Sequence, residues 1–254
     1  MQGSGLCSAV KEIQHRVKSM KIKEVFQPIG IIILGIFLLH VEAKGSESLA
    51  CEGNEFIEIV TPDDTMNDTI CVASFKAIQF LAQYDLHPKR TITIEIVERA
   101  IDSNGYVAFG SYNRQTDIIQ LMSYAAIISA NQSPQMYEQP FDVEHYQGAI
   151  AHEITHAVFH HNSRNIEDQL TNATQEYLAH STQLGVLATD RRNTIIAASD
   201  VGSWESGDSI SEVYMGLNPT GFAVKSYLHL TNLQDPEPFI KLLLHNNWFY
   251  ISVP

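Results

Sequence analysis

The sequence predicts an α+β protein in which a strand-rich N-terminal half precedes a helical C-terminal half. Two observations predict this order. Residues 55–60 and 91–97 alternate in the way that strands do, and helical spacing of apolar residues dominates from Val143 to the end. The apolar fraction of 44% can build a hydrophobic core, which excludes an intrinsically disordered chain. We therefore expect one domain, residues 44–254, made of two packed lobes.

The N-terminal half is predicted to be built mainly of strands. The β-branched, alternating stretch 91–97 is typical of a strand, and His87-Pro88 before it ends a predicted helix. Asn113-Arg114-Gln115 is the expected turn between the last two strands. In chain order we expect a strand at Glu55–Val60, a helix at Val72–Leu86, strands at Thr91–Val97, Tyr106–Ser111 and Asp117–Ser123, and a loop over 131–142.

Helical patterns dominate the C-terminal half, from Val143 to the end. Asn218-Pro219 and Asp235-Pro236 are typical helix starts, because proline is favoured at the first helical position. The expected helices span residues 144–161, 167–188, 208–217, 219–232 and 236–245.

The first 43 residues are predicted to be a secretory signal peptide. The apolar run 29–39 follows a basic segment and precedes Val41-Glu42-Ala43, which fits a cleavage site. The run is shorter than the about 20 residues that a membrane span needs. Met20 heads a more ordinary signal and is a candidate start, and an uncleaved N-terminal membrane anchor is the alternative. In either case we expect the domain outside the cytoplasm, in the periplasm or the extracellular space.

The net charge argues against some classes of binding partner, and the cysteines predict a disulfide. With 16 Lys and Arg against 29 Asp and Glu, the formal net charge is −13. This balance argues against a nucleic-acid partner and against docking on anionic membranes. Cys51 and Cys71 follow the predicted leader, and in an oxidising compartment we expect them to form a disulfide. Two free buried thiols are the alternative if the chain is not exported.

Residues 151–156 read Ala-His-Glu-Ile-Thr-His and contain the strongest chemical motif. In a helix, His152 and His156 lie one turn apart on the same face, so both imidazoles can reach one metal ion. Zinc accepts such nitrogens at about 2.0–2.1 Å. Glu153, one position on, can take a proton from a zinc-bound water. The alternative is a helix with merely polar histidines, and a third ligand decides between the two.

Glu176 is the candidate third ligand. It lies in a second helical pattern, 172–179, and consecutive helices can run antiparallel and face one another. His152, Glu153 and His156, with Glu176 at this separation, resemble the gluzincin metallopeptidases. The resemblance implies Zn²⁺ bound by His152, His156 and Glu176, with water in the fourth position and Glu153 as general base.

The resemblance extends to the order of elements. The strand–helix–strand–strand–strand order before the motif helix is similar to the upper lobe of small zincins, and the last two helical patterns resemble those of peptidase MA-like domains. This implies a zincin-like two-lobed fold, with a mixed sheet in the N-terminal lobe, a helical C-terminal lobe and the active-site helix between them. In that fold the last strand before the loop pairs with an extended peptide. The implied function is an exported zinc metallopeptidase that hydrolyses peptide bonds in peptide or protein substrates.

Two histidines bear on the ligand set. Gluzincins of the thermolysin type usually carry an aspartate four residues after the glutamate ligand, where it orients a ligand histidine; here this residue is His180. His160 is a rival third ligand, four residues past His156. Three consecutive histidines at that spacing on one straight helix converge poorly, which disfavours His160.

The remaining catalytic role is that of the group that stabilises the oxyanion. We expect Tyr214 in this role, with Tyr227 and His229 as alternatives. Two other functions stay open: a catalytically silent zincin-like structural or binding protein of the cell envelope, and a metal-free secreted binding module. The intact Glu153 argues against the silent protein, because a purely structural metal site does not need it.

Overall fold

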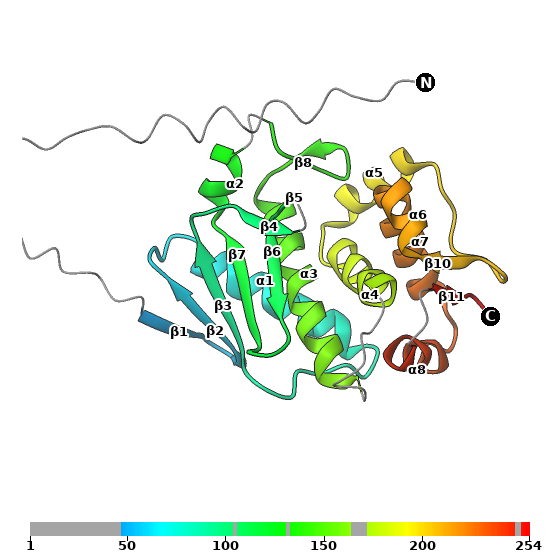
Figure 1. Cartoon of the computed structure of the whole chain (residues 1–254), viewed down its shortest axis with the longest axis horizontal. Coiled ribbons are helices and arrows are strands. Elements are labelled where there is room, and N and C mark those ends of the chain that lie inside the picture. Colours follow the sequence, from blue (N-terminus) through cyan, green and yellow to red (C-terminus); the bar gives the residue numbers. More distant parts are fainter. Residues whose placement is uncertain (1–46, 104–105, 131–132, 164–171, 247–249) are drawn as a thin grey trace, which may run out of the picture. The chain divides into compact units, whose positions relative to one another are not determined.

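The computed structural model describes residues 47–254 except 104–105, 131–132, 164–171 and 247–249, so the predicted signal peptide lies outside the described residues. In the described part, a mixed sheet forms the N-terminal half and helices dominate the C-terminal half, as the sequence predicts (Figure 1). Among the described helices, none is both long enough and apolar enough to cross a membrane.

A five-stranded mixed sheet has the order β1-β2-β3-β7-β6. The inner strands β2, β3 and β7 run parallel, and each edge strand runs antiparallel to its neighbour. One row of paired residues, Ile59, Ile94 and Ile119, crosses the inner strands, and all three side chains are buried. The strands of the N-terminal half are β1 (Glu47–Cys51), β2 (Asn54–Thr61), β3 (Ile92–Val97), β4 (Ile101–Ser103), β5 (Tyr106–Ala108), β6 (Gly110–Asn113) and β7 (Ile118–Met122).

The strand predicted at residues 106–111 is divided in two. The chain changes partner at Phe109: β5 before it pairs with β4, and β6 after it pairs with β7. The Phe109 ring packs against Phe141 with ring centroids 4.8 Å apart, which anchors the change of direction. The predicted turn after Asn113 is confirmed, because Asn113 accepts a backbone hydrogen bond from Thr116.

Helix α1 (Asn67–Ala82) covers the sheet and begins five residues earlier than the predicted helix. Its buried apolar residues are Ile70, Ala73, Ala77 and Leu81. Val72 and Phe75, which contribute to the apolar helical spacing of this segment, are about half exposed. The small side chains of Ala73 and Ala77 suit the close packing of α1 against helix α3 (Val143–Asn162).

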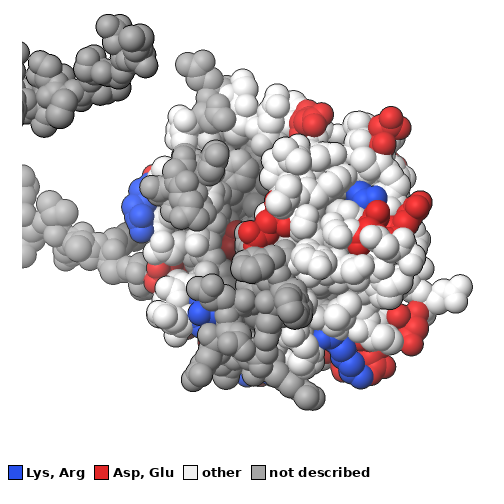
Figure 2. All heavy atoms as spheres, turned by 45° about the vertical axis from the view of Figure 1, so that its right-hand side comes forward, with Lys and Arg blue, Asp and Glu red and all other residues white. Residues whose placement is uncertain are grey.

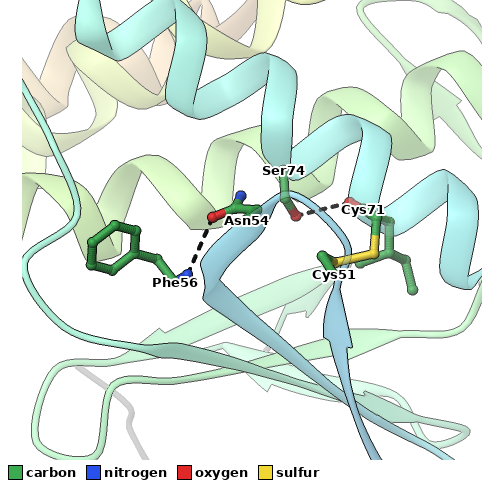
Figure 3. Close-up of a disulfide and its surroundings, with 6 residues drawn as sticks. Cys51, Asn54, Phe56, Cys71 and Ser74 are labelled. Carbon is green, nitrogen blue, oxygen red and sulfur yellow. Dashed lines mark hydrogen bonds between the residues drawn. A yellow bond between two sulfur atoms is a disulfide. The ribbon is translucent and has the colours of Figure 1, made fainter.

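A disulfide joins β1 to α1 and confirms the predicted pairing of Cys51 with Cys71 (Figure 3). The Cα atoms of the two residues lie 5.5 Å apart. Gly53, between β1 and β2, has φ = +78°, a left-handed conformation that glycine adopts without strain. The turn at Gly53 therefore places β2 antiparallel beside β1. The disulfide links this edge of the sheet to helix α1.

The C-terminal half differs from prediction in two places: helix α5 (Thr189–Ser199) is not among the predicted helices, and one predicted helix is shorter than expected. Residues 208–217 do not form a single helix: β10 (Ser209–Ser211) pairs with the distant strand β11 (Tyr250–Ser252), and α6 (Glu212–Leu217) follows. The Ser211 side chain accepts a hydrogen bond from the backbone of Tyr214, so Ser211 caps α6 and starts it late. The remaining elements are α2 (Tyr124–Ala130), β8 (Gln135–Met136), β9 (Gln139–Pro140), α4 (Asn172–Gly185), α7 (Pro219–Asn232) and α8 (Glu237–His245).

Helices α3 and α4 run antiparallel, and this pair carries the site. Gly148 lies against Gln183 near the start of α3, whereas His156, two turns later on α3, lies against Glu176 near the start of α4. A Cβ on Gly148 would come 3.3 Å from the Gln183 side chain, so glycine permits the close approach. Asp142 caps α3 by accepting a hydrogen bond from the backbone of His145 at 3.0 Å.

Candidate metal centre

Four ionisable side chains meet where α3 and α4 face one another. His152 and His156 come from successive turns of α3, and Glu176 and His180 come from successive turns of α4. Residues four apart on a helix share a face, so each helix contributes two side chains to one point. The motif histidines and the predicted third ligand Glu176 are thus brought together by the antiparallel pair.

The atoms of this cluster are spaced as metal ligands are. His152 Nε2 lies 3.1 Å from His156 Nε2 and 3.2 Å from a Glu176 carboxylate oxygen. His156 Nε2 and His180 Nε2 each lie 3.6 Å from the same carboxylate. Bonds of about 2.0–2.1 Å in a tetrahedral site place ligand atoms roughly 3.4 Å apart. The ligand atoms of His152, Glu176 and His180 all lie within 4.8 Å of one another, so these three side chains can hold a metal ion.

Each histidine of the cluster has a partner outside it. His152 Nδ1 lies 3.0 Å from Gln183 Oε1, an atom that can only accept, so the ring donates from Nδ1 and directs Nε2 toward the cluster. His180 Nδ1 lies 3.2 Å from the Tyr137 hydroxyl, and the His156 side chain hydrogen-bonds the Gln175 side chain. Metal-ligating histidines commonly have such outer partners, which fix the orientation of the ring.

The electrostatics of the cluster favour one positive charge beside Glu176. Burial works against the charged form of His152, but Glu176 outweighs it and raises the pKa of His152 to about 9. Burial lowers the pKa of His156 to about 4 and, together with His152, that of His180 to about 3. Burial alone would raise the pKa of Glu176, yet the histidines hold it below its ordinary value. A bound cation would take the place of the proton on His152.

Glu153 lies beside the cluster and is buried. Burial, with a smaller contribution from Glu176, raises the pKa of Glu153 to about 7 in spite of the opposing His152. Strand β6 covers this carboxyl group: a Cβ on Gly110 would lie 2.5 Å from the Glu153 side chain. Glycine at 110 is therefore needed for Glu153 to occupy its position.

A pocket of about 310 Å³ opens onto Glu153 and the cluster. Its walls come from the end of β5 and the start of β6, from the β8–β9 hairpin, from α3 and α4, and from the start of α7. The lining residues are Ala108, Phe109, Gly110, Met136, Tyr137, Ala149, His152, Glu153, His180, Gln183, Pro219 and Thr220. Five of these residues have apolar side chains, and the polar side chains that converge in the pocket are those of Tyr137, His152, Glu153, His180, Gln183 and Thr220.

The structure does not bring Tyr214 to this pocket. The Tyr214 ring packs against Trp204, with ring centroids 5.1 Å apart. Of its predicted alternatives, Tyr227 packs against Arg192, and buried His229 shares a 2.7 Å hydrogen bond with the Tyr177 hydroxyl. None of these three candidates is among the described residues that line the pocket.

Of the two other histidines considered for the site, His160 lies outside the cluster, as predicted, and His180 lies within it. His160 Nδ1 lies 2.9 Å from the Tyr112 hydroxyl, so His160 belongs to a network at the end of α3 and not to the cluster. His180 does not take the role of the orienting aspartate. Gln183 makes that contact instead, through its hydrogen bond with the outer nitrogen of His152, Nδ1. Instead, Nε2 of His180 faces Glu176.

The sequence-based prediction missed three residues of the site. Gln183 lies two helical turns after Glu176, so the helical period of α4 could have placed it on the same face. Tyr137 lies in the segment predicted as a loop, and Gly110 lies in a strand; neither has a local pattern that marks it. Both are positioned by tertiary packing alone.

Acidic side chains are spread over the face of the molecule shown in Figure 2, and some of them border a hollow near its centre.

Searches of curated proteins and of solved structures each returned no significant match. The sequence profile of a family of unknown function, DUF6639, matches residues 57–253, which include every residue of the cluster. The chain therefore belongs to the DUF6639 family.

Proposed function

We propose that this protein is an exported zinc-dependent metallopeptidase of the gluzincin type. The observation that carries the proposal is the meeting of His152, His156 and Glu176 at ligand spacing, with the carboxyl group of Glu153 beside them in a pocket. A chance His-Glu-x-x-His sequence gives no reason for a glutamate from another helix to meet both histidines.

The zincin-like fold is part of the same proposal. Strand β6 is an edge strand of the sheet and runs antiparallel to β7, and its first residue borders both Glu153 and the pocket. An edge strand offers unpaired backbone groups with which an extended chain can pair. This arrangement supports a peptide or protein substrate that lies along β6 with a peptide bond near Glu153.

The pocket residues have separate tasks in this chemistry. A zinc ion held by His152, His156 and Glu176 would supply Lewis acidity, polarising the carbonyl group and making water more acidic. The Glu153 carboxylate accepts the proton that the attacking water loses and passes it to the leaving amine. A pKa of about 7 suits this role, because a general base works best when its pKa lies near the working pH.

Export is the remaining part of the proposal. The basic, apolar and small-residue segments of residues 1–43 are typical of a secretory signal. The Cys51–Cys71 disulfide supports an oxidising location, because structural disulfides are rare in reducing cytoplasm. The net charge of −13 favours a substrate that is not strongly acidic and gives no support for a nucleic-acid partner.

Hydrolysis of a pool of internally quenched fluorescent peptides by the full-length protein tests this function. We expect the wild type to cleave and Glu153→Gln to lose about 100-fold or more in kcat while keeping its zinc, because the amide cannot accept the proton. Glu144→Gln, on the same helix but outside the pocket lining, is the matched control and should cleave like the wild type. Equal cleavage by Glu153→Gln and wild type, or none by the zinc-loaded wild type, would contradict the proposal.

A further inference from the structure

We propose that His180 is a fourth protein ligand of the metal, so that the ion is held by three histidines and one glutamate. This inference rests on the metal site of the proposed function. It goes beyond the His-His-Glu ligand set that the motif implies, because it adds a residue at the position where a gluzincin of the thermolysin type carries an orienting aspartate.

The position of the His180 ring carries the inference. Its Nε2 atom lies 3.6 Å from Glu176 Oε2, the same separation as that between His156 Nε2 and the other carboxylate oxygen. The ligand atoms of His152, Glu176 and His180 all lie within 4.8 Å of one another. An orienting residue would instead contact the outer nitrogen of a ligand histidine, and for His152 that contact is made by Gln183.

The second ring nitrogen of His180 is engaged from outside the cluster. Nδ1 lies 3.2 Å from the Tyr137 hydroxyl, which leaves Nε2 pointing toward Glu176. When Nδ1 donates to this hydroxyl, Nε2 carries the free lone pair that a metal requires. The arrangement repeats that of His152 with Gln183, which supports the same role for both rings.

The β8–β9 hairpin, which carries Tyr137, contains two residues with an unfavourable backbone conformation. Tyr137 and Glu138 both have left-handed backbones, with φ of +54° and +61°, where non-glycine residues are uncommon. These two residues form the turn between β8 and β9 and place the Tyr137 side chain in the pocket wall. The preceding residue, Met136, contacts Gln183 through its sulfur atom. The hairpin therefore supports the outer partners of two ligands at once.

A fourth ligand changes what the metal centre can do. Catalytic zinc sites usually have three protein ligands and keep one position for water, whereas four protein ligands are typical of structural sites. With His180 bound, water or a substrate carbonyl must enter as a fifth ligand or displace this histidine. We infer that the protein without substrate holds its metal more tightly than a three-ligand site would, and that Tyr137 is a positioning residue for the fourth ligand.

Metal binding by the full-length protein tests the inference with zinc and cobalt(II) as probes. For His180→Ala we expect zinc affinity, measured by competition with a chelator, to fall at least about 10-fold. The visible absorption of the cobalt(II)-loaded protein should change at the same time, because the coordination sphere changes. Tyr137→Phe should produce a smaller effect of the same kind. His245→Ala, which removes an exposed histidine at the end of α8, should match the wild type in both measurements.

An unchanged zinc affinity together with an unchanged cobalt(II) spectrum in His180→Ala would overturn the inference. If that variant does not fold, the comparison of His180→Gln with the wild type decides in the same way, and a wild-type spectrum in both His180→Gln and Tyr137→Phe would overturn it. The proposed function can stand when this inference fails: the wild type would then bind zinc and cleave peptides, with cleavage still dependent on Glu153. Failure of the wild type to bind either metal would overturn both.

Discussion

At the scale of single residues, the site depends on what surrounds the motif as much as on the motif itself. The Glu153 side chain lies against the backbone of β6 at Gly110. It fills the space that a side chain at position 110 would need. The same carboxyl group would act as general base in the proposed reaction. The position of Glu153 therefore depends on a residue of another element, 43 positions earlier in the chain.

Gly110→Ala tests this dependence. The new methyl group must displace the Glu153 side chain or β6, and we expect kcat to fall about 100-fold, because a misplacement of about 1 Å in a catalytic group can cost that much. Zinc content should stay unchanged, since the three atoms nearest to the added Cβ all belong to Glu153. Gly202→Ala is the matched control: nothing lies within 4 Å of its added Cβ. Full activity in Gly110→Ala would show that Glu153 is not the base or is not confined there.

At the scale of elements, a network of polar side chains joins β7 to the end of α3. The Asp117 carboxylate, just before β7, accepts hydrogen bonds from the Tyr112 hydroxyl at 2.7 Å, from His161 at 2.8 Å and from the Arg90 guanidinium at 2.6 Å. Burial opposes the charged form of Asp117, but these donors outweigh burial and hold the pKa of Asp117 well below its ordinary value. The network fixes the sheet against the helix that carries the motif.

Asp117→Asn removes this charge but keeps a residue type that tolerates the left-handed backbone, φ = +55°. We expect the free energy of unfolding in urea to fall by about 1–2 kcal/mol at neutral pH. Asp200→Asn is the matched control, because Asp200 is exposed and has φ = +51°. The change at Asp200 should cost little.

The pH dependence of the same variant has a definite sign. Because the folded pKa of Asp117 is depressed, its stabilisation is complete above the unfolded pKa of about 4 and is lost as the pH falls further. The difference between wild type and Asp117→Asn should therefore be constant near neutral pH and shrink below about pH 4. A difference that grows on acidification would contradict the assignment of Arg90, Tyr112 and His161 as the stabilising partners.

At the scale of the whole molecule, the features that the sequence predicts correctly are those that follow from the local spacing of residues or from composition. The His152–His156 pair, the disulfide of Cys51 and Cys71 and the mixed order of strands then helices all follow from spacing or composition. Glu176 could be proposed because two consecutive helices have few ways to pack.

Features that depend on distant partners could not be predicted in the same way. The strand β10 exists because β11, about 40 residues later, pairs with it. Helix α5 has a single fully buried apolar residue, Ile195, so its sequence shows little apolar periodicity. Tyr137 reaches His180 through a strained hairpin, and no local pattern in the sequence indicates that contact. Long-range packing decides each of these features.

Zinc content of the purified full-length protein, measured by elemental mass spectrometry after dialysis, tests the central claim of a metal centre between α3 and α4. The account predicts about one zinc per chain in the wild type and in Glu205→Ala, an exposed carboxylate control. It predicts zinc well below one per chain in Glu176→Ala, because the carboxylate that faces the histidines is lost. A wild type that holds no zinc even after zinc is supplied, or a Glu176→Ala variant that keeps full occupancy, would contradict it.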